Sequence, residues 1–90
     1  MTVSVRLPSA LKALTGSGVV KASGVTVAEA LFDLCCQFPD IEKRLLTPDR
    51  KLNKFLIVCI NGEDVRLKEG VSTLVFDGDE ISIIPAMSGG

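Results

Sequence analysis

The chain has 90 residues, 47 % of them hydrophobic, and a formal net charge of -1. A chain of this length holds one domain with one modest core. The near-zero net charge offers neither a basic field for nucleic acid nor a polybasic patch for a membrane surface, so we expect neither as a partner. The N-terminus lacks an apolar signal core because Arg6, Pro8 and Lys12 interrupt it, and we therefore expect a cytoplasmic protein.

The first half of the chain is predicted to form two strands and then the main helix. Thr2–Leu7 alternates apolar and polar residues, which indicates a half-buried strand that ends at Pro8. A single helical turn capped by Ser9 should follow, and Val19–Ser23 is typical of a second strand. The helix should begin at the capping box Thr26–Glu29, in which each side chain satisfies a backbone donor of the first turn. Its apolar stripe consists of Val27, Ala30, Leu31, Leu34 and Phe38.

The second half of the chain is predicted to return as strands over this helix. Phe55–Ile60 is apolar on both faces, which predicts the central strand of the sheet. Asn61-Gly62 is a strong hairpin signal, and Val65–Leu67 should begin the returning strand. The last strand is expected over Glu80–Ile84, with its isoleucines at 81 and 83 facing the helix.

This order of elements predicts an α+β fold of the β-grasp, or ubiquitin-like, type. We expect a mixed four- to five-stranded sheet packed on one main helix. The β-grasp domain is predicted to span residues 1–85, and residues 86–90 are predicted to be a flexible C-terminal tail that ends in Gly-Gly.

The end of the chain, Ile81–Gly90, combines a strand, a proline, a short tail and a terminal Gly-Gly. This ending resembles the MoaD/ThiS superfamily of ubiquitin-like sulfur carriers, which includes the molybdopterin-synthase small subunits and the thiamine sulfur carriers. The likeness spans the whole chain, from the Val-Arg-Leu-Pro start through the Thr-x-x-Glu helix start to the tail. The stretches 41–46 and 61–66 resemble in particular the carrier that feeds cysteine synthase.

The resemblance implies that the carboxylate of Gly90 is the reacting group. A separate E1-like adenylyltransferase and sulfurtransferase would use ATP to adenylate it and convert it to a thiocarboxylate. The thiocarboxylate would donate sulfur to a biosynthetic enzyme, for which a cysteine-synthase-like acceptor is preferred. The chain would then be a protein substrate rather than an enzyme, and it would bind no cofactor of its own.

Three alternatives to this function stay open. The chain resembles equally in its tail a molybdopterin-synthase small subunit, which would act with the large subunit of that enzyme. It also fits a ubiquitin-like modifier joined to lysines of target proteins. A plain interaction module would make no use of the terminal glycines.

The tail and one face of the sheet supply the predicted site residues. Gly89 and Gly90 lack side chains, so they can pass through a narrow channel in a partner; Met87 and Ser88 precede them in the tail. Ordering such a tail costs about 1–2 kcal/mol per residue, so the folded domain must dock elsewhere as well. The predicted partner-binding residues are Ile84, Ile57, Phe55 and, as a contact at the rim, Arg66.

The cysteines are not expected to do chemistry. The sequence has three cysteines and no histidine, which leaves no usual partner for a nucleophilic thiol and predicts no metal site. Cys35 and Cys36 are adjacent, so they form a poor disulfide framework and suit a reducing compartment. Cys59 lies in a predicted strand, where it is expected to pack as a small hydrophobe.

Overall fold

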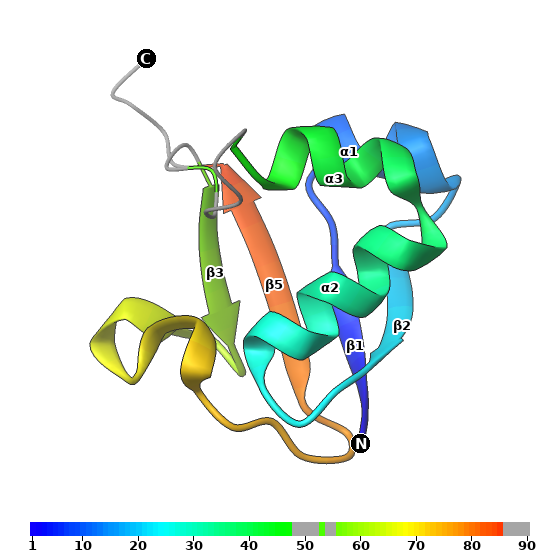
Figure 1. Ribbon diagram of the computed structural model, residues 1–90. Coiled ribbons are helices and arrows are strands. Elements are labelled where there is room, and N and C mark those ends of the chain that lie inside the picture. The colour runs from blue at the N-terminus through cyan, green and yellow to red at the C-terminus, as the bar shows by residue number, and fades with distance from the viewer. Residues whose placement is uncertain (48–52, 54–55, 86–90) are drawn as a thin grey trace.

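The protein is a five-stranded sheet with a layer of helices over one face (Figure 1). The computed structural model describes residues 1–47, 53 and 56–85. The strands lie in the order β2-β1-β5-β3-β4; β1 and β5 are parallel, and the other pairs are antiparallel. The elements are β1 (Thr2–Arg6), α1 (Ser9–Thr15), β2 (Val19–Ser23), α2 (Val27–Gln37), α3 (Pro39–Leu45), β3 (Leu56–Ile60), β4 (Glu63–Asp64), the 3-10 turns η1 (Val65–Leu67) and η2 (Gly70–Ser72), and β5 (Glu80–Pro85).

The predicted α+β class is confirmed, but the central strand is β5 rather than β3. Since the helices cover only one face, a central strand needs apolar residues on that face alone. In β5, Ile81 and Ile83 are buried beneath the helices, whereas Ser82 is only half-buried on the other face. The uninterrupted apolar run of β3 therefore indicates that both faces of this strand carry apolar side chains. It does not indicate that the strand is central in the sheet.

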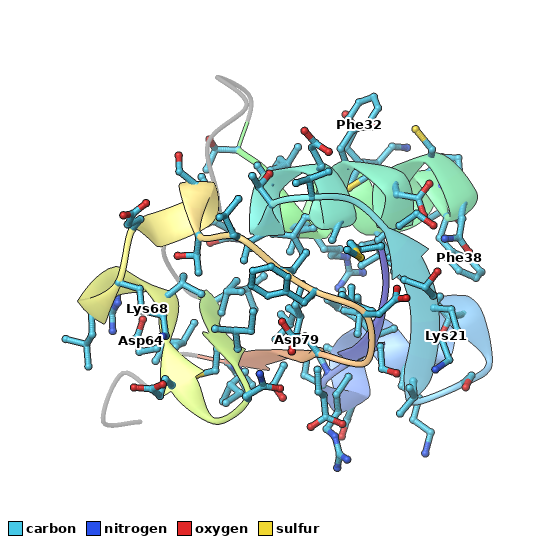
Figure 2. The ribbon with its side chains drawn as sticks, turned by 90° about the horizontal axis from the view of Figure 1, so that it is seen from below. Lys21, Phe32, Phe38, Asp64, Lys68 and Asp79 are labelled. Atoms are coloured by element: carbon cyan, nitrogen blue, oxygen red, sulfur yellow. The ribbon has the colours of Figure 1, made fainter. Side chains whose placement is uncertain are left out.

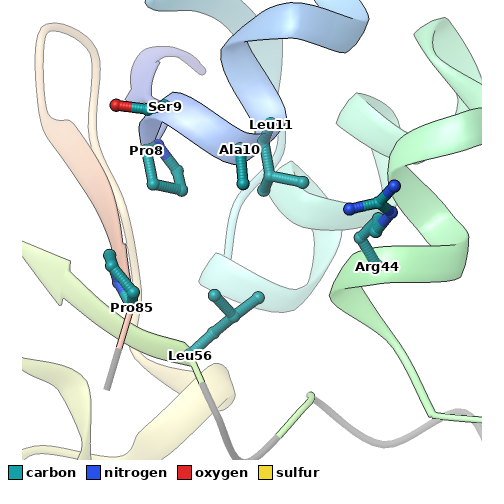
Figure 3. Close-up of a pocket in the computed structure, with 7 residues that line it drawn as sticks. All are labelled: Pro8, Ser9, Ala10, Leu11, Arg44, Leu56 and Pro85. Atoms are coloured by element: carbon teal, nitrogen blue, oxygen red, sulfur yellow. The ribbon is translucent and has the colours of Figure 1, made fainter. Parts of the chain in front are cut away.

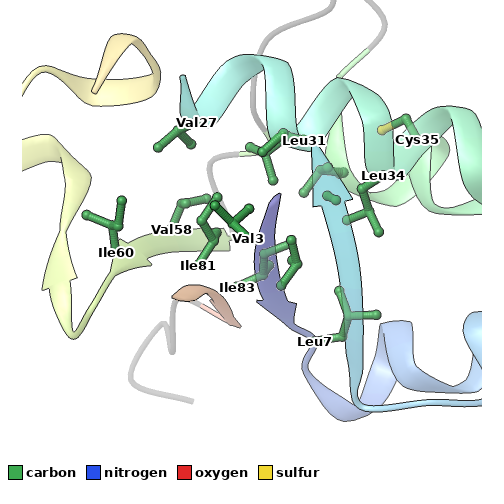
Figure 4. Packing of buried hydrophobic residues seen from close by; sticks show 14 of the residues in the cluster. Val3, Leu7, Val27, Leu31, Leu34, Cys35, Val58, Ile60, Ile81 and Ile83 are labelled. Carbon is green, nitrogen blue, oxygen red and sulfur yellow. The ribbon is translucent and has the colours of Figure 1, made fainter. Parts of the chain in front are cut away.

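The core lies between the sheet and the helices (Figure 4). Alternate residues of β1, β3 and β5 point into it, and α2 contributes its apolar stripe. The α2 stripe matches the prediction at Val27, Ala30, Leu31 and Leu34, with Cys35 added to it. Phe38 was predicted as its last member but follows the end of the helix and is only half-buried against the core. The buried residues are Val3, Val5, Leu7, Leu11, Ala22, Val27, Ala30, Leu31, Leu34, Cys35, Ile41, Leu45, Val58, Ile60, Val65, Val75, Ile81 and Ile83. No helix of the described ranges is long and apolar enough to cross a membrane.

Helix α2 begins at the predicted capping box, with one difference. The Thr26 hydroxyl accepts a hydrogen bond from the backbone N–H of Glu29 at 3.2 Å, as expected. The Glu29 carboxylate accepts from the N–H of Val25 at 3.0 Å, one residue before the cap. Two backbone donors at the start of the helix are thereby satisfied, which stabilises the helix by about 1 kcal/mol for the cap alone.

The predicted cap at Ser9 is wrong, because α1 is capped by Pro8 and runs for two turns rather than one. The carbonyl of Pro8 accepts from the backbone N–H groups of Leu11 and Lys12, and no side chain caps the helix. Proline suits the start of a helix because the N–H that it lacks would have no partner there. Gly16 closes α1 in the left-handed conformation, at φ 75°.

The predicted strand over Val65–Leu67 is also wrong. The turn Asn61-Gly62 forms as expected, with positive φ at both residues, but pairing ends after the two residues of β4. The Asp64 side chain then accepts from the N–H of Arg66 at 2.8 Å and starts a 3-10 turn. This local bond replaces the ladder bond of a strand, and it turns Val65 into the core.

Side chains of α2 cover the free edge of the sheet at β2. The Asp33 carboxylate accepts from the N–H of Ser23 at 3.0 Å and from the Gln37 amide at 2.9 Å. The same Gln37 amide donates to the carbonyl of Lys21 at 2.9 Å. An edge strand with free backbone groups invites pairing with other chains, and these bonds occupy two of the backbone groups on this edge.

Gly24 joins β2 to α2 where there is no room for a side chain. A Cβ at this position would lie 2.6 Å from the backbone nitrogen of Ala30 and 2.8 Å from Cβ of Glu29. Both atoms belong to the first turns of α2, which is fixed by its buried stripe. The close approach of this loop therefore requires glycine.

We expect Gly24→Ala to lower the free energy of unfolding by about 1–3 kcal/mol, the usual cost of forcing an extra carbon into a packed site. Urea unfolding followed by circular dichroism measures the change. Gly18→Ala is the matched control, because a Cβ there meets only side-chain carbons of Lys12, at 3.8 and 3.9 Å. Equal unfolding midpoints for the two variants would contradict the prediction.

Candidate functional site

The predicted site residues fall into two groups, those in the sheet up to Pro85, the last residue of β5, and those in the tail after it. The predicted tail residues lie outside the described residues, and so does Phe55. The described part of the candidate site is therefore the region of the sheet that surrounds the end of β5.

Ile84 and Ile57 are neighbours on the face of the sheet that the helices leave open. They are paired directly across β5 and β3, and the next pair on the same face is Ser82 with Cys59. Side chains of directly opposed residues approach within about 4.5–5.5 Å at Cβ. Ile84 is 43 % exposed, and Ile57 is half-buried. The structure thus brings these two predicted residues together in one apolar patch beside the start of the tail.

A charged pair that the sequence analysis did not single out lies on the same face. Arg6 of β1 and Glu80 of β5 form an ion pair, with Nη2 and Oε2 separated by 3.2 Å. The pair joins strands that are 74 residues apart in sequence, so only the parallel register of β1 and β5 reveals it. Exposed pairs of this kind contribute at most about 1 kcal/mol to stability. The pair places two opposite charges next to the apolar patch.

The structure does not bring Arg66 to this patch. Arg66 follows β4, and β3 separates β4 from β5 in the sheet. Its guanidinium contacts the Asp64 carboxylate, with Nη2 and Oδ2 at 2.6 Å and Nε and Oδ2 at 3.0 Å. The hydrogen bonds from Arg66 hold the pKa of Asp64 below its ordinary value. Asp64 and Lys68 lie together at this edge of the molecule (Figure 2).

The cysteines do not form a reactive centre in the described residues. All three are free thiols; Cys35 is buried, Cys36 is exposed and Cys59 is half-buried. Burial, together with the nearby Glu42 and Cys36, raises the pKa of Cys35 to about 11. A thiol with this pKa is almost entirely protonated at neutral pH, so it is a poor nucleophile. Within the ranges described, no cluster of acidic, cysteine or histidine side chains has the arrangement of a metal site.

Comparison with known proteins relates the whole chain to small sulfur carriers and modifiers. The sulfur carrier protein CysO of Mycobacterium tuberculosis is 39% identical over 93 residues, which cover 100% of both chains. A chain of the Amycolatopsis orientalis BexX/CysO complex superposes with a TM-score of 0.86 at 39% identity, covering 98% of this chain and 99% of that one. SAMP1 from Haloferax volcanii superposes with a TM-score of 0.87 at 28% identity, covering 100% of both.

The full-length superposition on these proteins confirms the predicted ubiquitin-like fold. The model of the ThiS family matches residues 5–90. The matched region runs from β1 through β5 and includes the terminal Gly-Gly. The chain therefore belongs to the ThiS family.

Proposed function

We propose that this chain is a sulfur carrier protein whose C-terminal Gly90 is converted to a thiocarboxylate. The observation that supports this function most directly is the extent of the family match, which reaches Gly90 itself. The proteins named CysO, described as sulfur carriers, align over their entire length as well.

The proposed chemistry proceeds in two displacements. In the first, the Gly90 carboxylate attacks the α-phosphate of ATP, and pyrophosphate leaves as the acyl-adenylate forms. In the second, a sulfide-level sulfur nucleophile attacks the acyl carbon, and AMP leaves with one of the original carboxylate oxygens. The thiocarboxylate therefore carries sulfur in place of that oxygen, with no net oxidation. An E1-like partner enzyme would bind the ATP and catalyse both steps.

The part of this chain is to present the terminus at a fixed place. β5 pairs with β1 as far as Ser82 and with β3 as far as Pro85, so the sheet sets the point from which the tail begins. The five residues after Pro85 span at most about 16–18 Å when extended. A partner that holds the domain on the sheet can thus receive Gly90 in an active site at that depth. The apolar pair Ile84 and Ile57 is the surface that we propose for this docking.

We further propose that a cysteine-synthase-like enzyme accepts the sulfur and that the protein works in the cytoplasm. The CysO proteins favour this acceptor by their name and by identity over the full length. The resemblance of SAMP1, whose relatives are named small archaeal modifier proteins, favours a protein modifier as the second candidate. The two functions share the adenylate and diverge at the product, a thiocarboxylate in one case and an isopeptide bond in the other.

We expect the intact chain to gain the mass difference between one sulfur and one oxygen atom after incubation with ATP, sulfide and the E1-like enzyme of its host. Intact mass spectrometry measures this shift. Deletion of Gly90 should abolish it, because the acyl carbon of the product belongs to that residue. An unchanged mass, with an enzyme shown to be active on another carrier, would contradict the proposed function. An adduct with lysine-bearing proteins would favour the modifier.

We expect Ile84→Asp to raise the KM for adenylation at least about tenfold, since a charge in a central apolar contact removes a binding hot spot. Pyrophosphate release at a series of carrier concentrations measures KM. Ile84→Thr keeps a β-branched side chain in the strand and should show a smaller increase. Phe32→Asp is the control, because Phe32 is 66% exposed and projects from α2 away from the sheet (Figure 2). Equal KM values for Ile84→Asp, Phe32→Asp and the unaltered chain would contradict the assignment.

A further inference from the structure

A concave surface lies at the end of the sheet where β5 finishes (Figure 3). It is a pocket of about 270 Å³ between the start of α1, helix α3 and the ends of β3 and β5. Its walls are mainly apolar, and Figure 3 shows the guanidinium of Arg44 directed toward Leu11 across the pocket. The lining residues are Pro8, Ser9, Ala10, Leu11, Arg44, Leu56 and Pro85.

Arg44 brings to this pocket a positive charge that pairs with no carboxylate of the described residues. The described part of the chain contains two other arginines, and each holds a carboxylate: Arg6 with Glu80 and Arg66 with Asp64. The Arg44 side chain forms no such pair with a described residue, and none of the residues that line the pocket is acidic. A guanidinium presents several donors in a planar fork that matches a carboxylate. The charge of the pocket therefore suits an anion of that shape.

The size of the pocket suits one amino-acid side chain. Pockets that hold cofactors or drug-sized ligands generally enclose about 300–1,000 Å³, so a volume of about 270 Å³ lies below that range. Interfaces between proteins commonly place a single anchor side chain in a pocket of apolar walls. An aliphatic or aromatic side chain would contact Leu11 and Leu56, while a neighbouring acidic side chain would reach Arg44.

The position of the pocket links it to the tail. Pro85 forms part of its wall and is the residue from which the tail begins. Because only five residues separate Pro85 from Gly90, a protein that receives Gly90 in its active site lies within about 16–18 Å of this pocket, close enough for its surface to reach it. Ile84 on the open face directly precedes Pro85 in β5, so the apolar patch and the pocket are adjacent at the end of this strand.

We propose that this pocket docks an apolar side chain flanked by a carboxylate on the enzyme that activates the C-terminus. The inference rests on the proposed function, since it assumes that such an enzyme handles Gly90. Arg44 pairs with the carboxylate and the apolar walls take the anchor side chain. The contact fixes the domain beside its tail, so it acts on binding of the carrier and not on the adenylation step.

Charge reversal at Arg44 tests the ionic half of the proposal. Arg44→Glu should raise the KM of the host's E1-like enzyme for the carrier at least about tenfold, which corresponds to about 1.4 kcal/mol, with kcat unchanged. Lys43→Glu is the matched control because it changes the same charge at the adjacent exposed residue of α3, which does not line the pocket. Raising the salt concentration should reduce the difference between Arg44→Glu and the unaltered chain.

Filling the pocket tests its apolar half. Ala10 lines the pocket and is exposed, so Ala10→Phe should occupy the space without disturbing the core and should raise KM similarly. Ala13→Phe is the control, since Ala13 is exposed on the same helix and does not line the pocket. Circular dichroism and urea unfolding establish that all four variants are folded before their kinetics are compared.

The outcomes separate this inference from the proposed function. If the unaltered chain gains sulfur but Arg44→Glu and Ala10→Phe match their controls, the pocket proposal is wrong and the carrier function stands. If the unaltered chain gains no sulfur, the carrier function itself fails. Nuclear magnetic resonance of the free chain provides a further check: a shift of the Arg44 side-chain Nε–H signal on deleting residues 86–90, or on raising protein concentration, would assign the pocket to the chain's own tail or to a second copy and overturn the proposal.

Discussion

The parallel pairing of β5 with β1 is the contact on which the rest of the structure depends. It places Val5 beside Ile81, so the two ends of the chain share one buried row beneath α2. Without it, β1 and β2 would form a hairpin separate from β3, and α2 would have no continuous surface to cover. The antiparallel pairing of β5 with β3 continues beyond it to Leu56 and Pro85, and it holds the last described residue in the sheet. The pairing of β5 into the sheet therefore both completes the fold and sets the point from which the tail begins.

Much of the fold was predictable because its strands and main helix are buried on one side only. Half-buried strands show a period of two, and the stripe of α2 has the period of a helix. The pattern alone therefore indicates that residues such as Ile81 and Ile83 are buried. The place of β3 was not predictable, since an apolar run does not state how many neighbours a strand has. The 3-10 turn at Val65 was not predictable either, because it depends on a single hydrogen bond that the Asp64 carboxylate accepts from the backbone N–H of Arg66.

The candidate site was predictable to the extent that it is local in sequence. The terminal glycines are visible directly, and alternation in β5 places Ile84 on the open face. The pairing of Ile84 with Ile57 needed the register of the sheet. The pocket around Arg44 draws on four segments that are distant in sequence, and no pattern within any one of them indicates a concave surface.

The central place of the last strand also sets the order in which the protein can fold. While a nascent chain has emerged only as far as residue 79, β1 and β3 have no common partner, because both pair through β5. Such a chain exposes unpaired strand edges and apolar surface, which are the features that promote aggregation and degradation. A chain whose synthesis stops before β5 therefore does not form a folded domain that lacks the reactive terminus. A partner enzyme meets the docking face only on chains in which the strand that leads to the reactive terminus has been made.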